Sequence, residues 1–197
     1  MGGANIIGNN IGMTYGTATV AGMGVAMKII MIGTFIFIGF SSGVQPLVGY
    51  NYGSENFKRV KDIISTAIRM TTVIGIVLLF ILGFISPYLI DIFTNDVEVI
   101  EKGTIILRAL LLSLPFVGGQ MIGTGTAQST GKAMAAMILS ISRQGILYVP
   151  IVLILNSLFG FYGFILAQPI TDMIMRVVTA IYIKYAIKIE EVTITTV

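Results

Sequence analysis

The sequence contains no cysteine, no histidine and no tryptophan, and it carries little charge of either sign. Without cysteine and histidine, the chain has no thiol nucleophile, no disulfide bond and none of the usual zinc ligands. Catalysis by a Ser-His-Asp triad is also excluded within it. Charged residues make up 11% of the chain, whereas soluble domains typically have about 25%. We therefore predict that most of the surface faces lipid and that the protein is not an enzyme.

Long stretches without charge are the main positive feature. They cover residues 29–54, 70–90, 109–131 and 144–171, and a helix needs about 20 mostly apolar residues to cross a bilayer. The last stretch is divided by the turn-like segment NSLFGFYG at 156–163. Alternation of apolar and polar residues, which would indicate transmembrane strands, is absent. The predicted fold class is an all-α membrane protein with about five transmembrane helices, at 20–43, 66–90, 105–127, 134–155 and 162–186.

Basic residues fall on alternate predicted loops. The loop after the first helix contains Lys58, Arg59 and Lys61, whereas the loop after the second is mainly acidic. Lys132 follows the third helix, and Lys184 and Lys188 lie at the end of the fifth helix and just after it. Because basic loops stay in the cytoplasm, this pattern places the N-terminus outside the cell and the C-terminus inside. A net charge of only +3, dispersed in this way, fits a membrane protein better than one that binds nucleic acid.

The segment GFSSGVQPLVGYNYGSENFKRVK at 39–61 resembles the MATE family of multidrug and toxic compound extrusion transporters. In that family a helix ends in Gly-x-Gln-Pro and is followed by a Gly-Tyr-Asn-x-Gly loop. The matching residues here are Gly43, Gln45, Pro46, Gly49, Tyr50, Asn51 and Gly53. Further similarity covers PYLIDIFTND at 87–96, residues 114–155 and FGFYGFILAQPITDMI at 159–174. The similarity therefore extends over roughly residues 18 to 186.

The resemblance implies helices eight to twelve of a transporter whose twelve helices form two lobes. On this interpretation residues 1–17 are a truncated extracytoplasmic loop, 18–188 the C-terminal transmembrane lobe and 189–197 a cytoplasmic tail. The N-terminal lobe and helix seven are missing, so the chain is a fragment or a short natural protein. Pro46, which lacks an amide hydrogen, is expected to end its helix, and Gly49 and Gly53 are expected to form a tight turn.

Ionisable residues inside transmembrane helices are costly, so each is a candidate for function. Four lie well inside the predicted helices, away from their ends: Lys28, Arg143, Asp172 and Arg176. Asp172 and Arg176 are four residues apart, on one helix face, which predicts an ion pair between them. The sequence leaves open that Arg143 pairs with Asp172 instead. It also leaves open whether Asp172 is a structural anchor or a carboxylate that is protonated during transport.

A drug-binding wall is expected to be apolar and adaptable, and methionine suits it. The residues predicted to line a substrate cavity are Met23, Met27, Met31, Phe35, Gln120, Met121, Gln128 and Tyr148. The helix that matches helix ten of the family has no Asp or Glu. The sequence thus resembles branches that place the key carboxylate in the N-terminal lobe. No cofactor or metal is expected, and the coupling ion of the full-length transporter is Na⁺ or H⁺.

Three functions remain open at this stage. The first is one half of a secondary-active antiporter that exports cationic amphipathic compounds from the plasma membrane by alternating access. The second is a flippase for lipid-linked oligosaccharides, with Lys28, Arg143 and Arg176 as a basic cavity. The third is a membrane fragment that does not transport alone. The expected partners are membrane lipid, a drug-like small molecule and the missing N-terminal lobe.

Overall fold

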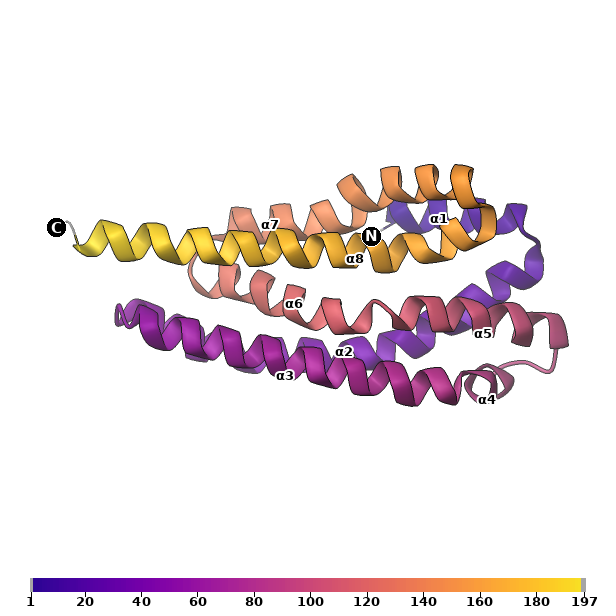
Figure 1. The fold of residues 1–197 in the computed structure, drawn as a ribbon, viewed down its shortest axis with the longest axis horizontal. Coiled ribbons are helices and arrows are strands. Elements are labelled where there is room, and N and C mark those ends of the chain that lie inside the picture. The colour runs from indigo at the N-terminus through magenta and orange to yellow at the C-terminus, as the bar shows by residue number, and fades with distance from the viewer. Residues whose placement is uncertain (1, 196–197) are drawn as a thin grey trace.

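The computed structural model describes the backbone of residues 2–195 and the side chains of residues 6–186. It is an elongated bundle of helices, and the described residues contain no strand (Figure 1). The predicted all-α fold class is confirmed. In chain order the helices are α1 (Gly2–Thr14), α2 (Thr17–Gly53), α3 (Phe57–Phe84), α4 (Ser86–Asp91), α5 (Val97–Leu111), α6 (Leu114–Ser129), α7 (Ala133–Ile141), the π-helix η1 (Ser142–Leu147) and α8 (Tyr148–Thr195).

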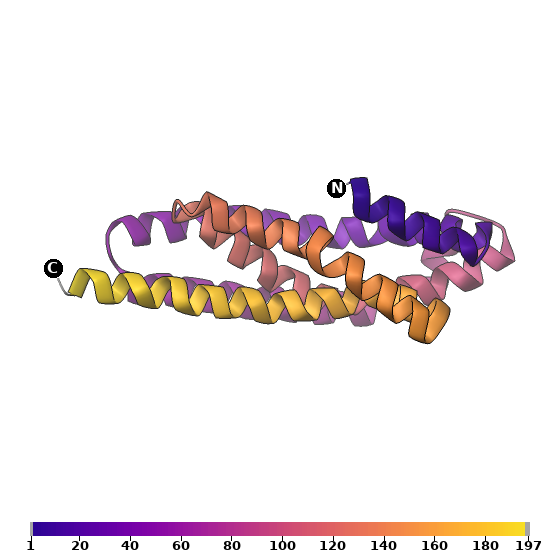
Figure 2. The same cartoon turned by 90° about the horizontal axis from the view of Figure 1, so that it is seen from above.

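Three helical stretches are long and apolar enough to cross a membrane: α2, α3 and the combined segment Ala133–Ala186. The α5–α6 pair, bent by 47° between Leu111 and Leu114, qualifies as a fourth. The 54-residue segment Ala133–Ala186 reverses direction at Gly160, as both views show (Figures 1 and 2). Counting its two arms separately, the described chain makes five passes, which agrees with the predicted number.

Gly160 makes the reversal possible. Its φ of 57° and ψ of −134° lie in a region that residues with a side chain rarely enter. Two contacts hold the two arms and α1 together at this end of the bundle. Gly163 lies so close to the carbonyl of Leu155 that a Cβ would clash with it, and the Tyr15 hydroxyl donates to Asn156 Oδ1 at 2.6 Å.

Replacing Gly160 with Ala is therefore expected to lower stability by about 1–3 kcal/mol, the usual cost of forcing a side chain into such a conformation. The free energy of unfolding in mixed micelles would measure it. Gly39→Ala is the matched control, because Gly39 is helical and nothing lies within 4 Å of its missing Cβ. A Gly160→Ala chain as stable as the control would show that the reversal does not need this backbone conformation.

Helix α6 is the centre of the bundle because its glycines let three neighbours approach closely. A Cβ on Gly118 would lie 2.6 Å from the Thr71 Cβ of α3, and a Cβ on Gly125 would lie 2.6 Å from the Ser41 Oγ of α2. Gly119 and Gly123 face α8 in the same way. Close contact of this kind is the usual way in which membrane helices associate.

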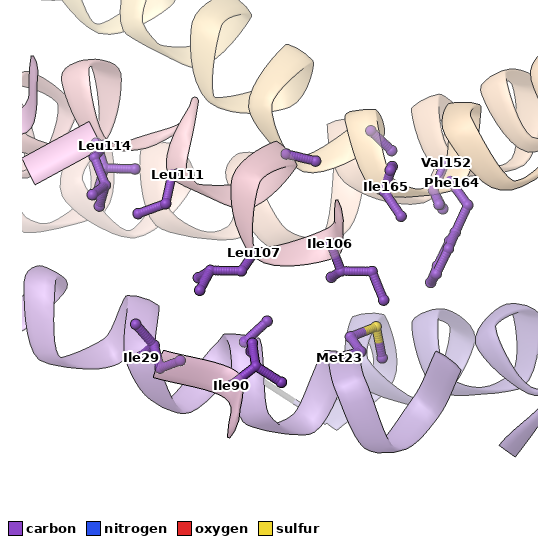
Figure 3. Close-up of a cluster of buried hydrophobic side chains, with 14 of the residues drawn as sticks. Met23, Ile29, Ile90, Ile106, Leu107, Leu111, Leu114, Val152, Phe164 and Ile165 are labelled. Atoms are coloured by element: carbon purple, nitrogen blue, oxygen red, sulfur yellow. The ribbon is translucent and has the colours of Figure 1, made fainter. Parts of the chain in front are cut away.

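The largest buried apolar cluster lies beside α6, between α2, α4, α5 and α8. Figure 3 shows Ile106 and Leu107 of α5 pointing toward Met23 of α2 and Ile90 of α4. Phe164 and Ile165 of α8 close the cluster on one side. These contacts fix the positions of α2, α5 and α8, the helices that carry most of the site described below.

The loops separate by charge onto the two ends of the bundle. The α2–α3 junction, the α6–α7 junction and the C-terminal end of α8 lie at one end (Figure 1). Lys58, Arg59 and Lys61 lie at the start of α3 and Lys132 in the α6–α7 junction, so we call this the basic end. The α4–α5 connection, with Asp96 and Glu98, lies at the opposite end together with the Gly160 reversal.

Two predictions about local structure are wrong. Residues 1–17 were expected to form a loop, but Gly2–Thr14 form α1, whose Ile7 and Ile11 pack on the core. Pro46 was expected to end its helix, but α2 continues through it to Gly53 and includes Gly49. A single missing amide is tolerated inside a membrane helix because neighbouring groups can satisfy the freed carbonyl. The turn forms later, where Glu55 adopts a φ of 58°.

The C-terminal tail predicted at 189–197 overlaps the end of α8, which continues to Thr195. Its separation from the lobe at residue 188 stays a prediction. Residues 196 and 197 lie outside the described chain. The predicted helix at 105–127 is the α5–α6 pair, which is broken at Leu112 and Ser113. Pro115, in the first turn of α6, explains why the helix restarts there.

Candidate functional site

An apolar cavity of about 460 Å³ lies between α2, the α5–α6 bend, η1 and α8. Apolar and aromatic side chains, chiefly methionine, isoleucine and leucine, make up most of its wall, and a few polar groups interrupt it. The lining residues that matter below are Met23, Met27, Met31, Phe35, Met121, Arg143, Tyr148, Gln168 and Asp172. Met31 and Phe35 are 56% and 54% exposed, so this wall of the cavity is open at the surface of α2.

A second cavity of about 670 Å³ adjoins the first and is more polar. It lies between α2, α6 and the α7–η1 segment, and it is lined by Ser41, Ser42, Gln45, Gln120, Thr124, Gln128, Ser140, Arg143 and Gln144 among others. Four residues, Ile38, Met121, Arg143 and Gln144, line both cavities. The two spaces are therefore neighbours that meet at these side chains.

An ion pair marks this boundary. Arg143 Nε donates to Asp172 Oδ1 at 2.7 Å, and Gln168 Nε2 donates to Asp172 Oδ2 at 3.1 Å. The side chain of Asp172 is fully buried, whereas that of Arg143 is 20% exposed. Both carboxylate oxygens thus have a donor, which is what a buried charge requires. Of the residues that the structure describes, Arg143 and Asp172 are the only charged ones in the lining of the two cavities.

The local fold explains how Arg143 reaches Asp172. Residues Ser142–Leu147 form a π-helical turn between α7 and α8, and single π turns inside helices occur frequently at functional sites. Asp172 lies on the second arm of α8, where Gln168, four residues earlier, shares its face. The π turn and the second arm thus place both partners at the junction of the cavities.

The expected pair between Asp172 and Arg176 is absent, and the alternative that the sequence left open is the one observed. Arg176 points to the opposite side of α6, where a Cβ on Gly119 would lie 2.5 Å from its Nε. Its Nη1 is buried without a hydrogen-bond partner among the described residues. A spacing of four residues places Asp172 and Arg176 on one face of α8. The direction of each side chain, however, depends on its contacts with the neighbouring helices.

All eight residues predicted to line a cavity do line one of these two. Met23, Met27, Met31, Phe35 and Tyr148 contact the apolar cavity, and Met121 contacts both. Gln120 and Gln128 contact the polar cavity. Gln144 and Gln168 were not predicted to line a cavity. Amide side chains are rare within these charge-free stretches, and that rarity could have identified them.

The remaining predicted residues lie apart from this site. Lys28 is exposed and lines neither cavity, and Arg176 faces a separate groove. The three cations proposed for a flippase cavity are therefore not brought together. Of the motif residues Gly43, Gln45, Pro46, Gly49, Tyr50, Asn51 and Gly53, only Gln45 contacts the polar cavity.

Two of the other motif residues make contacts near the end of α2. Gly49 packs near the carbonyl of Ser129, and the Asn51 side chain donates to the Leu47 carbonyl at 2.8 Å. Gly43 and Gly53 have open space where a Cβ would lie, and Tyr50 is 79% exposed. The motif therefore lies mainly outside the two cavities, in the C-terminal part of α2.

Comparison with known proteins gives one consistent family. The MatE family model matches residues 4–154. The multidrug export protein MepA of Staphylococcus aureus strain MRSA252 is 32% identical over 174 residues, covering 88% of this chain and 38% of that protein. The corresponding MepA of Staphylococcus haemolyticus is 31% identical over 188 residues, covering 95% of this chain and 41% of that protein.

Solved structures show the same fold at lower identity. The Vibrio cholerae MATE transporter VcmN in its bent form aligns with a TM-score of 0.90 and 16% identity, covering 96% of this chain and 43% of VcmN. An outward-facing multidrug resistance transporter of the MATE family and MOP superfamily aligns with a TM-score of 0.88 and 21% identity, covering 94% of this chain and 42% of its own. The chain thus spans less than half the length of the proteins it matches.

Proposed function

Since this chain belongs to the MatE family of membrane transporters, we propose that it forms the C-terminal lobe of a multidrug efflux antiporter. The observation that carries the proposal is the apolar, methionine-rich cavity with one buried ion pair. Such a wall accepts varied apolar compounds because methionine side chains adapt their shape. The relatives named multidrug export protein MepA support the same activity.

The substrate class follows from the lining. An amphipathic cation would place its apolar body against Met23, Met27 and Met31. Its positive charge would approach the amide oxygens and hydroxyls of the polar cavity. The opening beside Met31 and Phe35 faces outward from the lobe, where a companion N-terminal lobe would complete the cavity. Alternating access would then arise from rocking of the two lobes around this space.

Coupling to Na⁺ or H⁺ is assigned to the companion lobe. Among the described residues, Asp172 is the only carboxylate that lines the two cavities, and both of its oxygens already accept hydrogen bonds. Its carboxylate is therefore engaged with two fixed donors, Arg143 and Gln168, in a buried ion pair. We therefore assign Asp172 a structural role. The function requires a coupling ion and no cofactor.

The orientation in the membrane is part of the proposal. The basic end of the bundle, with Lys58, Arg59 and Lys61, would face the cytoplasm by the positive-inside rule. The Gly160 reversal and the α4–α5 connection would then lie outside the cell. The polar cavity lies toward the basic end, since Gln45 and Gln128 come from the last turns of α2 and α6.

The test is to co-express this chain with an N-terminal lobe from a MatE relative in bacteria that lack their own exporters. We expect ethidium accumulation to fall when both halves are present and to remain unchanged with either half alone. Membrane abundance of both halves must be equal in all strains. Unchanged accumulation with two abundant and associated halves would contradict the proposed function.

Filling the cavity should reduce export. Met31→Trp adds a bulky ring at a half-exposed cavity position, and we expect ethidium efflux in the two-lobe assay to fall at least fivefold. Met137→Trp is the matched control, because Met137 is 50% exposed on α7 and lines neither cavity. Equal efflux by the two variants, at equal abundance, would exclude this cavity from the transport path.

A further inference from the structure

A groove on another face of the bundle is distinct from the transport cavities. It lies between α3, α6 and the second arm of α8, has a volume of about 450 Å³ and shares no residue with either cavity. It is lined by Thr72, Pro115, Phe116, Arg176, Val177, Ala180, Ile181 and Lys184. Val177 and Ile181 are 55% and 51% exposed. In a membrane protein such an apolar, open surface is in contact with lipid chains.

Arg176 is the unusual feature of this groove. Its guanidinium is held against Gly119, and its Nη1 is buried without a hydrogen-bond partner in the described part of the chain. The nearest acid on its own helix, Asp172, is already bonded to Arg143 and Gln168. A buried cationic N–H without a partner is costly. Arg176 therefore needs an anion that the described residues do not provide.

The depth of Arg176 in the bilayer can be read from α3 and α4. Residues 70–90 carry no charge, and at 1.5 Å per residue they span about 30 Å, the thickness of the hydrocarbon core. Arg69 immediately precedes this charge-free stretch, on the side that faces the basic end of the bundle. Thr72, which lines the groove with Arg176, lies one turn inside it. Arg176 is therefore close to the boundary between acyl chains and head groups.

Lys184 lies farther out along the same groove. The second arm of α8 runs toward the basic end (Figure 1), and eight residues separate Arg176 from Lys184, or about 12 Å along the helix. Lys184 is exposed. The apolar part of the groove thus lies at the depth of the acyl chains. Lys184 lies at the depth of the head groups, and Arg176 lies just below it.

We propose that this groove binds one anionic phospholipid of the leaflet at the basic end. The phosphate lies between Lys184 and the guanidinium of Arg176, which phosphate oxygens match as acceptors. The acyl chains lie along Phe116 and Val177. Charge complementarity selects an anionic over a zwitterionic lipid, because each Lys or Arg near the surface attracts anionic lipid.

The experiment is native mass spectrometry of the full 197-residue chain, delipidated in detergent and titrated with phosphatidylglycerol or phosphatidylcholine of identical acyl chains. We expect the wild type to bind phosphatidylglycerol about tenfold more tightly. Arg176→Gln and Lys184→Gln are each expected to weaken that binding roughly fivefold. Lys58→Gln, which removes the same charge at the same end but outside the groove, should leave it unchanged.

A second variant keeps the test informative if loss of Arg176 impairs folding. Ala180→Phe fills the groove from an exposed position and retains both cations, and it should abolish the preference for phosphatidylglycerol. Equal binding of the two lipids by the wild type would overturn the proposal and leave the companion lobe as the source of the anion. A preference that survives Ala180→Phe or the double variant Arg176→Gln/Lys184→Gln would overturn it as well.

Discussion

Arg143→Gln destabilises the chain more than Asp172→Asn does. Removing one partner of a buried ion pair typically costs about 3–5 kcal/mol, because the other charge remains buried and unpaired. Asp172 is fully buried, so it cannot reach water when Arg143 is lost. Arg143 is 20% exposed beside the polar cavity and can be hydrated when Asp172 is neutralised. We expect Asp172→Asn to lower the free energy of unfolding by about 1–2 kcal/mol less than Arg143→Gln does.

Unfolding in mixed detergent–SDS micelles would measure both variants, at one pH and one protein concentration. The double variant Arg143→Met/Asp172→Leu is the control, because it removes both charges together and keeps apolar volume. We expect it to recover most of the lost stability, as replacement of other buried pairs has done. Equal losses in the single variants, or a double variant no more stable than Arg143→Gln, would contradict the assigned role of the pair.

Gly123→Leu is expected to prevent assembly of the bundle. The missing Cβ of Gly123 would overlap the Thr179 Cγ2 of α8, and Thr179 is fully buried. Overpacking usually costs about 1–3 kcal/mol and occasionally more. Here a β-branched residue with restricted rotamers cannot move aside, so α6 and α8 must separate. We expect the abundance of the chain in membranes to fall to a tenth or less.

Gly39→Leu provides the comparison, since it makes the same change in a membrane helix at a position with open space around the missing Cβ. Its abundance should equal that of the wild type, measured by immunoblot of washed membranes. A normal level of the Gly123→Leu chain would show that α8 can pack on α6 at a greater distance than the structure has.

Composition was sufficient to predict the number of passes, and helical periodicity placed several of the cavity candidates on one helix face. Charge-free length predicted the five passes, because the bilayer imposes it on any helix that crosses. Met23, Met27 and Met31 recur at helical spacing, so they were bound to share a face of α2. What that face contacts was not in the sequence, and only the packing of α5, η1 and α8 around it makes it a cavity.

Features that depend on contacts between helices were not predictable. Asp172 could pair with Arg176 or Arg143 by sequence alone, and the close approach of Gly119 to the Arg176 side chain decided between them. Pro46 looked like the end of a helix because its local effect is unfavourable. The contacts of Ser41, Gln45 and Gly49 with α6 explain why α2 nevertheless continues past it.

Because Ser142–Leu147 form a π-helical turn, the number of residues between α7 and α8 affects the geometry of the ion pair. A π turn holds one residue more than an α turn, and each residue of an α-helix rotates the chain by about 100°. Deleting one residue that follows Arg143 in this turn would let it close as an α-helix, with α7 and the first arm of α8 close to their present phase, so mainly the side chains within the turn would change direction. Arg143 is one of these side chains, and its contact with Asp172 would be altered although both residues were still encoded. Insertions and deletions here should therefore be as damaging as substitutions of the pair, whereas a similar length change in the exposed α4–α5 connection should be tolerated.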